Sequence, residues 1–167
     1  MLFSRPILLA LLCAASIAGA DTKPLTVGDA SPSLSVKDQF DKPIAIDAQT
    51  QLLLFSNSMD ASKLVTEAMT ATTPICQKSD AIRYFADIAK MPGLIAKTFA
   101  VPKMRERPFR IGLIWESETA AAIPRQEKQV TLIAIENGSV ARIQFAADKQ
   151  AIEQAIASVC PPPTAAY

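Results

Sequence analysis

The sequence predicts one α/β domain with a mixed central sheet, an N-terminal hairpin and helices on both faces. Short apolar strands alternate with amphipathic helices in the middle of the chain, and an Asn137-Gly138 turn follows later. Helices between strands imply parallel crossovers, whereas the Asn-Gly turn implies an antiparallel pair. The length of 167 residues and the half-apolar composition are those of one globular domain.

The first half of the domain is predicted to contain a hairpin, a buried strand and a helix. Turn-forming residues lie within and around residues 34–43, which suits a short hairpin. The continuous apolar run 51–55 suits a central strand that is buried on both faces. A helix then begins at a cap formed by Ser58 or Asp60, and the turn and proline residues 72–74 end it.

The second half continues the alternation and ends in a hairpin and a helix. Pro92-Gly93 begins a helix that is predicted to end near Pro102, because proline interrupts helical hydrogen bonding. Asn and Gly tolerate the positive φ angles of a type I′ turn, so Asn137-Gly138 joins two strands. Asp148 caps the last helix, and Trp115 is predicted to belong to the core. The predicted strands are residues 81–88, 109–115, 130–135 and 140–145.

The N-terminal segment has the features of a secretory signal peptide. Arg5 is the one charged residue among the first twenty, and an apolar run follows over residues 7–17. Small residues at positions 18–20 predict cleavage after Ala20. The run is shorter than the about 20 residues of a membrane-spanning helix, although an uncleaved N-terminal anchor remains the alternative. The predicted organisation is a signal peptide (1–20), a domain (21–160) and a flexible proline-rich tail (161–167).

Composition excludes several classes of site and partner. The chain contains no histidine, which removes histidine-based catalysis and histidine-ligated zinc, and its net charge of +1 disfavours nucleic-acid binding. Its three cysteines cannot form an all-cysteine zinc site. No apolar stretch beyond residue 20 could cross a bilayer, so we expect no stable membrane insertion after cleavage. The predicted location is the periplasm or the exterior, where the even pair Cys76 and Cys160 suggests a disulfide.

Several segments occur in the order found in one protein superfamily. The segment 27–32 (VGDASP), followed by KDQ at 37–39, is similar to the opening "VGxxAP…xDxxG" of that family. Residues 53–55 match the strand that enters its redox helix, and 109–116 with 130–138 match its "FPVxxD … PTxFLIDxDG" segment. Over residues 25–159 the chain therefore resembles the thioredoxin-like superfamily, in its peroxiredoxin and periplasmic thiol-reductase branch.

The sequence departs from this family at the residues that carry its chemistry. The family's Cys-x-x-Cys motif falls at Asp60 to Lys63, and its cis-proline falls at Gln129 or Val130. Thiol–disulfide exchange requires a thiolate, which Asp60 and Lys63 cannot supply. We therefore expect a retained fold with a degenerate redox site. Asp60 is interpreted as a helix cap, with contact to a ligand as the alternative.

The resemblance also implies where the two remaining cysteines lie. The family packs the helix that precedes Cys76 and the helix that ends at Cys160 on the same sheet face. Both helices should end at the edge opposite the family's active site, where a structural disulfide could form. Two free buried thiols, or a reactive or partner-linked Cys76, are the alternatives.

Two groups of polar residues are candidates for ligand binding. Ligands of α/β sheets bind beyond the carboxyl ends of parallel strands. Three carboxylates and one amide follow the predicted strands at this end of the sheet. The ordinary interpretation is that these side chains are solvated, and the alternative is that they bind a hard cation. A basic loop before residue 109 is either solvated or contacts an anion or a partner. The first group is Asn57, Asp60, Asp87 and Glu116, and the second is Lys103, Arg105, Arg107 and Arg110.

These observations favour a non-enzymatic binding or accessory module without a metal or cofactor. Its partner is an unidentified protein or small molecule, because no segment carries a readable binding motif. The alternative is a thiol-dependent oxidoreductase or peroxidase that uses Cys76. The distance between Cys76 and the N-terminus of the first long helix distinguishes the two hypotheses.

Overall fold

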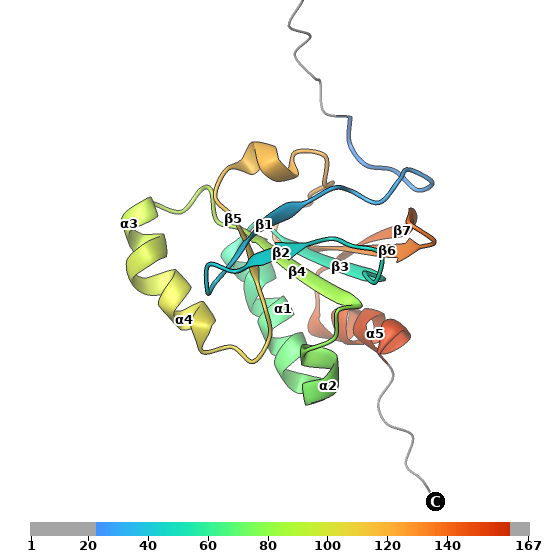
Figure 1. Ribbon diagram of the computed structural model, residues 1–167. Coiled ribbons are helices and arrows are strands. Elements are labelled where there is room, and N and C mark those ends of the chain that lie inside the picture. The colour runs from blue at the N-terminus through green and yellow to red at the C-terminus, as the bar shows by residue number, and fades with distance from the viewer. Residues whose placement is uncertain (1–22, 161–167) are drawn as a thin grey trace, which may run out of the picture.

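A mixed sheet runs through the centre of the computed structural model, which describes residues 23–160 (Figure 1). The predicted signal peptide and tail lie outside the described residues. The strand order is β2-β1-β5-β4-β3-β6-β7. The strands are β1 (Ser35–Asp38), β2 (Pro43–Ala45), β3 (Leu52–Ser56), β4 (Ile82–Asp87), β5 (Gly112–Ile114), β6 (Val130–Glu136) and β7 (Ser139–Ala146).

Three neighbouring strands, β3, β4 and β5, are parallel, and the other pairs are antiparallel. We call the edge at their carboxyl ends the upper edge and the opposite one the lower edge. Because both crossovers step in the same direction and are right-handed, their helices lie on one face. The helices are α1 (Met59–Ala71), α2 (Pro74–Gln77), α3 (Gly93–Ile95), the π-helix η1 (Ala96–Ala100), α4 (Val101–Arg105), the 3-10 helix η2 (Ser117–Ala120) and α5 (Lys149–Val159).

The hydrophobic core forms one layer on each side of the sheet. On one side, Val65 of α1 and Ile152 of α5 pack with Leu54 and other strand residues. On the other side, Phe55 and Phe85 pack under η2 and the N-terminal segment. Figure 1 shows α1 and α5 below the sheet and η2 above it. The predicted α/β class and mixed sheet are therefore confirmed, with a single short 3-10 helix on the second face of the described domain.

Two prolines act differently from their predicted roles. The helix predicted to end near Pro102 continues to Arg105, because a π-turn precedes this residue. The Val101 N–H donates to the Ala96 carbonyl, five residues back, and Pro102 falls in the first turn of α4, where a missing N–H is tolerated. Pro74 ends α1 as predicted but also begins α2, which the sequence analysis missed.

Trp115 is also placed differently from its predicted position in the core. It follows β5 at the upper edge and is 41% exposed. The Lys97 ammonium lies 5.9 Å from the centroid of its indole ring. The apolar run that predicted burial includes β5, but this residue lies just beyond the strand, where no second layer covers it.

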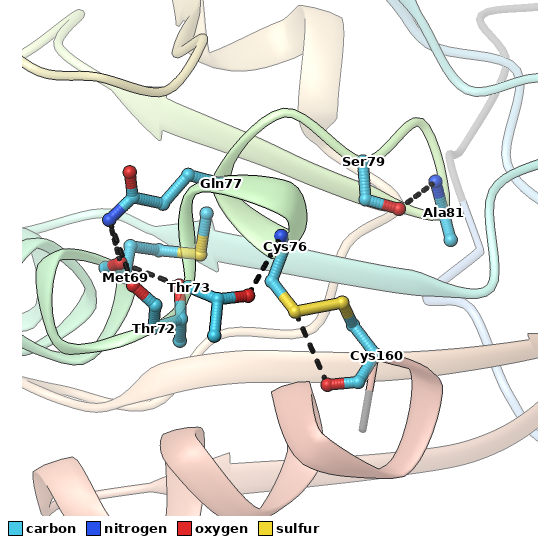
Figure 2. Close-up of a disulfide and its surroundings, with 8 residues drawn as sticks. All are labelled: Met69, Thr72, Thr73, Cys76, Gln77, Ser79, Ala81 and Cys160. Carbon is cyan, nitrogen blue, oxygen red and sulfur yellow. Dashed lines mark hydrogen bonds between the residues drawn. A yellow bond between two sulfur atoms is a disulfide. The ribbon is translucent and has the colours of Figure 1, made fainter. Parts of the chain in front are cut away.

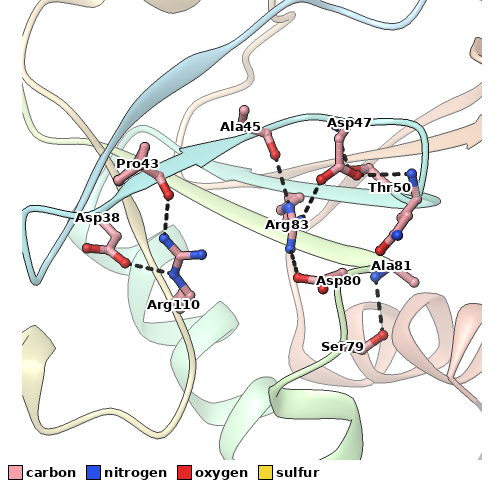
Figure 3. A network of polar contacts seen from close by, with 11 residues as sticks. Asp38, Pro43, Ala45, Asp47, Thr50, Ser79, Asp80, Ala81, Arg83 and Arg110 are labelled. Atoms are coloured by element: carbon pink, nitrogen blue, oxygen red, sulfur yellow. Dashed lines mark hydrogen bonds and ion pairs between the residues drawn. The ribbon is translucent and has the colours of Figure 1, made fainter.

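A buried arginine fastens the N-terminal hairpin to the sheet (Figure 3). Arg83 of β4 is only 8% exposed, and its guanidinium donates to the Ala45 carbonyl and to the carboxylates of Asp47 and Asp80. The hydrogen bond from Arg83 holds the pKa of Asp47 below its usual value. These bonds fix the segment between β2 and β3 at the lower edge.

Gly138→Val is expected to destabilise the domain through the β6–β7 turn. Asn137 and Gly138 have φ angles of 51° and 75°, which a β-branched residue resists. The expected loss is about 1–3 kcal/mol, the usual scale of local backbone strain. Urea denaturation measures it, with Asn137→Gly as a control that keeps both positive φ angles accessible. An unchanged denaturation midpoint for Gly138→Val would contradict the turn assignment.

Candidate functional site

The N-terminus of α1 at the upper edge carries no thiol. Ser58 caps the helix, with its hydroxyl accepting a hydrogen bond from the Ala61 N–H. Asp60 is therefore not the capping residue and lies exposed in the first turn. The side chain of Lys63 is 77% exposed and pairs with Glu67 at 3.9 Å. This end of the helix thus presents a carboxylate and an ammonium to solvent.

A buried hydroxyl network lies behind the first turn of α1. The Ser56 hydroxyl, at the end of β3, lies 2.9 Å from the hydroxyls of both Ser62 and Tyr84. Burial raises the pKa of Tyr84, so its phenol stays neutral at neutral pH. The three hydroxyls satisfy one another, and the network joins α1 to the sheet without offering a base or a nucleophile.

Asp87 at the end of β4 is engaged in an ion pair. Its side chain is 4% exposed and lies 3.1 Å from Nη1 of Arg125. It also accepts hydrogen bonds from the Ala89 N–H and the Ser117 hydroxyl. The Arg125 guanidinium lies 5.1 Å from the centroid of the Phe55 ring. The pair fixes the loop that follows β5. Sequence reasoning missed Arg125, which belongs to no motif.

The four residues predicted at the ligand-binding end do not form one site. Asp60 and Asp87 line a groove between α1 and α4, whereas Glu116 lines a separate hollow beside Trp115. Asn57 lines neither. Within the part of the chain that the structure describes, no group of three acidic or cysteine side chains could hold a metal ion.

The two cysteines are joined at the lower edge (Figure 2). Their Cα atoms lie 5.7 Å apart, within the range of an ordinary disulfide. Cys76 lies on α2, where its N–H donates to the Thr73 hydroxyl, and Cys160 caps the end of α5. Asp60 lies in the first turn of α1, and the bridge lies beyond the other end of this 13-residue helix, which spans about 20 Å.

The chain is similar in fold to solved structures of peroxiredoxins and of proteins named as members of the thioredoxin family. One is peroxidoxin BcpB from Mycobacterium tuberculosis, with 11% identity over 81% of this chain and 96% of that chain, and a TM-score of 0.55. Another is a thiol:disulfide interchange protein from Chlorobium tepidum, with 9% identity over 80% and 97% of the two chains, and a TM-score of 0.54. The fold is thioredoxin-like. No family model and no curated protein matches the chain.

Within this thioredoxin-like fold, the predicted basic patch is divided between two places. Lys103 and Arg105 lie on α4 rather than in a loop, which corrects the prediction. Arg110 donates to the Asp38 carboxylate at 2.7 Å (Figure 3). Burial raises the pKa of Asp38, but hydrogen bonds from Arg110 and two backbone N–H groups outweigh this, and the pKa is lowered. Arg105 likewise donates to the Gln39 carbonyl, so both arginines fasten the hairpin.

The other two basic residues face the groove between α1 and α4. Lys103 lines it from α4, and Arg107 lines it just after that helix ends. The groove has a volume of about 920 Å³, within the range of small-molecule sites in proteins. Three other hollows on the domain, among them the one beside Trp115, have volumes of about 280 Å³ or less.

Proposed function

We propose that the protein is an exported, redox-inactive thioredoxin-like protein that acts as a binding or accessory module. The observation that carries this proposal is the position of the disulfide. Cys76 and Cys160 are paired at the lower edge, whereas Asp60 and Lys63 occupy the helix start where the family places its thiols.

The chemistry of thiol exchange supports the absence of redox turnover. Exchange requires an accessible thiolate, whose pKa is usually lowered at a helix N-terminus or beside a cation. Cys76 is 3% exposed and already bonded to Cys160, so it offers no free thiolate that could attack a substrate disulfide. The carboxylate of Asp60 cannot replace a cysteine in this exchange, which requires sulfur both as the nucleophile and as the leaving group.

The proposed location outside the cytoplasm rests on two independent features. The first twenty residues have the charge and apolar pattern of a cleaved signal peptide. A structural disulfide is also typical of proteins that fold in an oxidising compartment. Within residues 23–160, no helix is long and apolar enough to cross a bilayer. The proposed partners are a small molecule or another protein in that compartment.

Activity assays test the redox-inactive part of the proposal. The purified mature protein, without residues 1–20, should neither reduce insulin disulfides nor consume hydrogen peroxide above a control without protein, because it lacks a thiolate at the helix start. A thioredoxin of known activity serves as the positive control. Turnover that disappears in Cys76→Ser would contradict the proposal and establish the alternative, a thiol-dependent oxidoreductase or peroxidase that uses this cysteine.

A further inference from the structure

The groove between α1 and α4 has an apolar floor. Tyr84 belongs to β4 and Ile88 follows that strand, whereas Ile111 lies just before β5. Met91 and Met104 line the same space and are only half-buried. Flexible methionine side chains on such a surface adapt to apolar ligands of different shapes. The floor therefore suits a hydrocarbon chain or ring rather than a polar head group.

The groove stays open because its two helical walls pack independently against the sheet. The α3–η1–α4 segment packs against the sheet with Ala96 and Val101 in the core, and α1 packs against it with Ala61 and Val65. The side of α1 that faces the groove presents residues such as Thr66.

Some of the charged side chains along the walls form ion pairs and others do not. Lys63 pairs with Glu67, Lys149 pairs with Glu153, and Asp87 pairs with Arg125. In contrast, within residues 23–160, Lys103 and Arg107 on the α4 side have no ion-pair partner, and neither does Asp60 on the α1 side.

These two cations lie four residues apart at the α4 wall, beside the apolar floor. This wall therefore attracts a negative group, and a guanidinium beside an ammonium can bind both oxygens of a carboxylate.

We propose that the groove binds an amphiphilic carboxylate, with its carboxylate held by Lys103 and Arg107 and its apolar chain on the floor. This inference rests on the proposed function as a binding module and names its ligand class. An extended peptide fits less well, because both walls are helices and, among the described residues, no strand edge lines the groove to pair with a peptide backbone. The Tyr84 hydroxyl is also already bonded to Ser56. The site thus recognises one anionic head and an apolar tail.

Isothermal titration calorimetry with dodecanoate, below its micelle concentration, tests the proposal. The protein expressed from its full sequence should bind one dodecanoate per chain. The double variant Lys103→Ala/Arg107→Ala should bind it about tenfold or more weakly, since two charge-assisted bonds are lost. Thr66→Trp, which fills the groove from the α1 wall, should abolish binding. Lys78→Ala/Lys97→Ala removes the same charge away from the groove and should leave the affinity unchanged.

Probes of other chemistry separate the possible results. Dodecyltrimethylammonium, with the same chain and the opposite charge, should bind at least about tenfold more weakly than dodecanoate. The proposal is overturned if both amphiphiles bind equally, if neither binds, or if the groove variants bind dodecanoate as the unmodified protein does. It is also overturned if sedimentation shows a dimer that Thr66→Trp dissociates, because a second copy is then the occupant. Failure of dodecanoate binding without redox turnover rejects the ligand class alone, whereas insulin or peroxide turnover rejects the proposed function.

Discussion

Removal of the Cys76–Cys160 disulfide is expected to lower the free energy of unfolding by about 2–5 kcal/mol. The bridge closes a loop of 84 residues, and the chain-entropy model gives about 4–5 kcal/mol for a loop of this length. Cys160 also packs against the core layer that contains α1 and α5. The lost bridge should therefore destabilise the whole domain rather than only its lower edge.

Urea denaturation with and without dithiothreitol measures this effect. The oxidised protein without residues 1–20, which contain Cys13, should show no free thiol on titration under denaturing conditions. The variant Cys76→Ala/Cys160→Ala should be less stable than the oxidised protein and insensitive to the reductant. Equal midpoints for the oxidised and reduced protein, or two titratable thiols in mature protein purified without a reductant, would show that the bridge does not form in solution.

Gly112→Ala is expected to destabilise the domain by about 3 kcal/mol, the upper end of ordinary overpacking. A Cβ atom at this position would overlap the Phe85 ring, lying 2.6 Å from its Cε1 atom, and would lie 3.1 Å from a methyl group of Val36. Phe85 is fully buried and directly opposite Gly112 in the β4–β5 register, so its ring has no space into which to move. The added methyl group must therefore displace β5 or the ring.

Thermal or urea denaturation measures this loss, and a second glycine provides the matched control. Gly93 has no atom within 4 Å of a built Cβ, so Gly93→Ala should change stability by no more than about 1 kcal/mol. In a Phe85→Leu background the smaller side chain leaves room, and Gly112→Ala should cost less than in the unmodified protein. Additive effects of Gly112→Ala and Phe85→Leu would contradict the proposed overlap.

The local patterns of the chain are sufficient to predict most of its elements. The apolar run 51–55, the Asn137-Gly138 turn and the cap at Asp148 correspond to β3, the β6–β7 hairpin and the start of α5. Each depends on the backbone preferences of a few adjacent residues, and these preferences can be inferred from the sequence without knowledge of the fold. Pro102 shows the limit of such reasoning, because a π-turn accommodates it within a longer helical segment.

The candidate site is less predictable, because it depends on which side chains meet across the sheet. Asp87 has the sequence context of a free strand-end carboxylate, but Arg125 from a distant loop neutralises it. Lys103 and Arg110 belong to the same predicted basic group, yet Lys103 lines the groove while Arg110 binds Asp38 of the hairpin. Ion pairs between residues far apart in the chain leave no periodic signal in the sequence.

By itself the sequence determined the α/β class, the order of most elements and the absence of a thiol at the start of α1. These properties follow from residue identity and local backbone preference. Only the tertiary structure decided that Cys76 meets Cys160 and that Gly112 faces the Phe85 ring. It also decided that two unpaired cations border an apolar groove. Such contacts join residues far apart in the chain, and their geometry is set by crossover handedness, strand register and the packing of α1 and α4 against one sheet face.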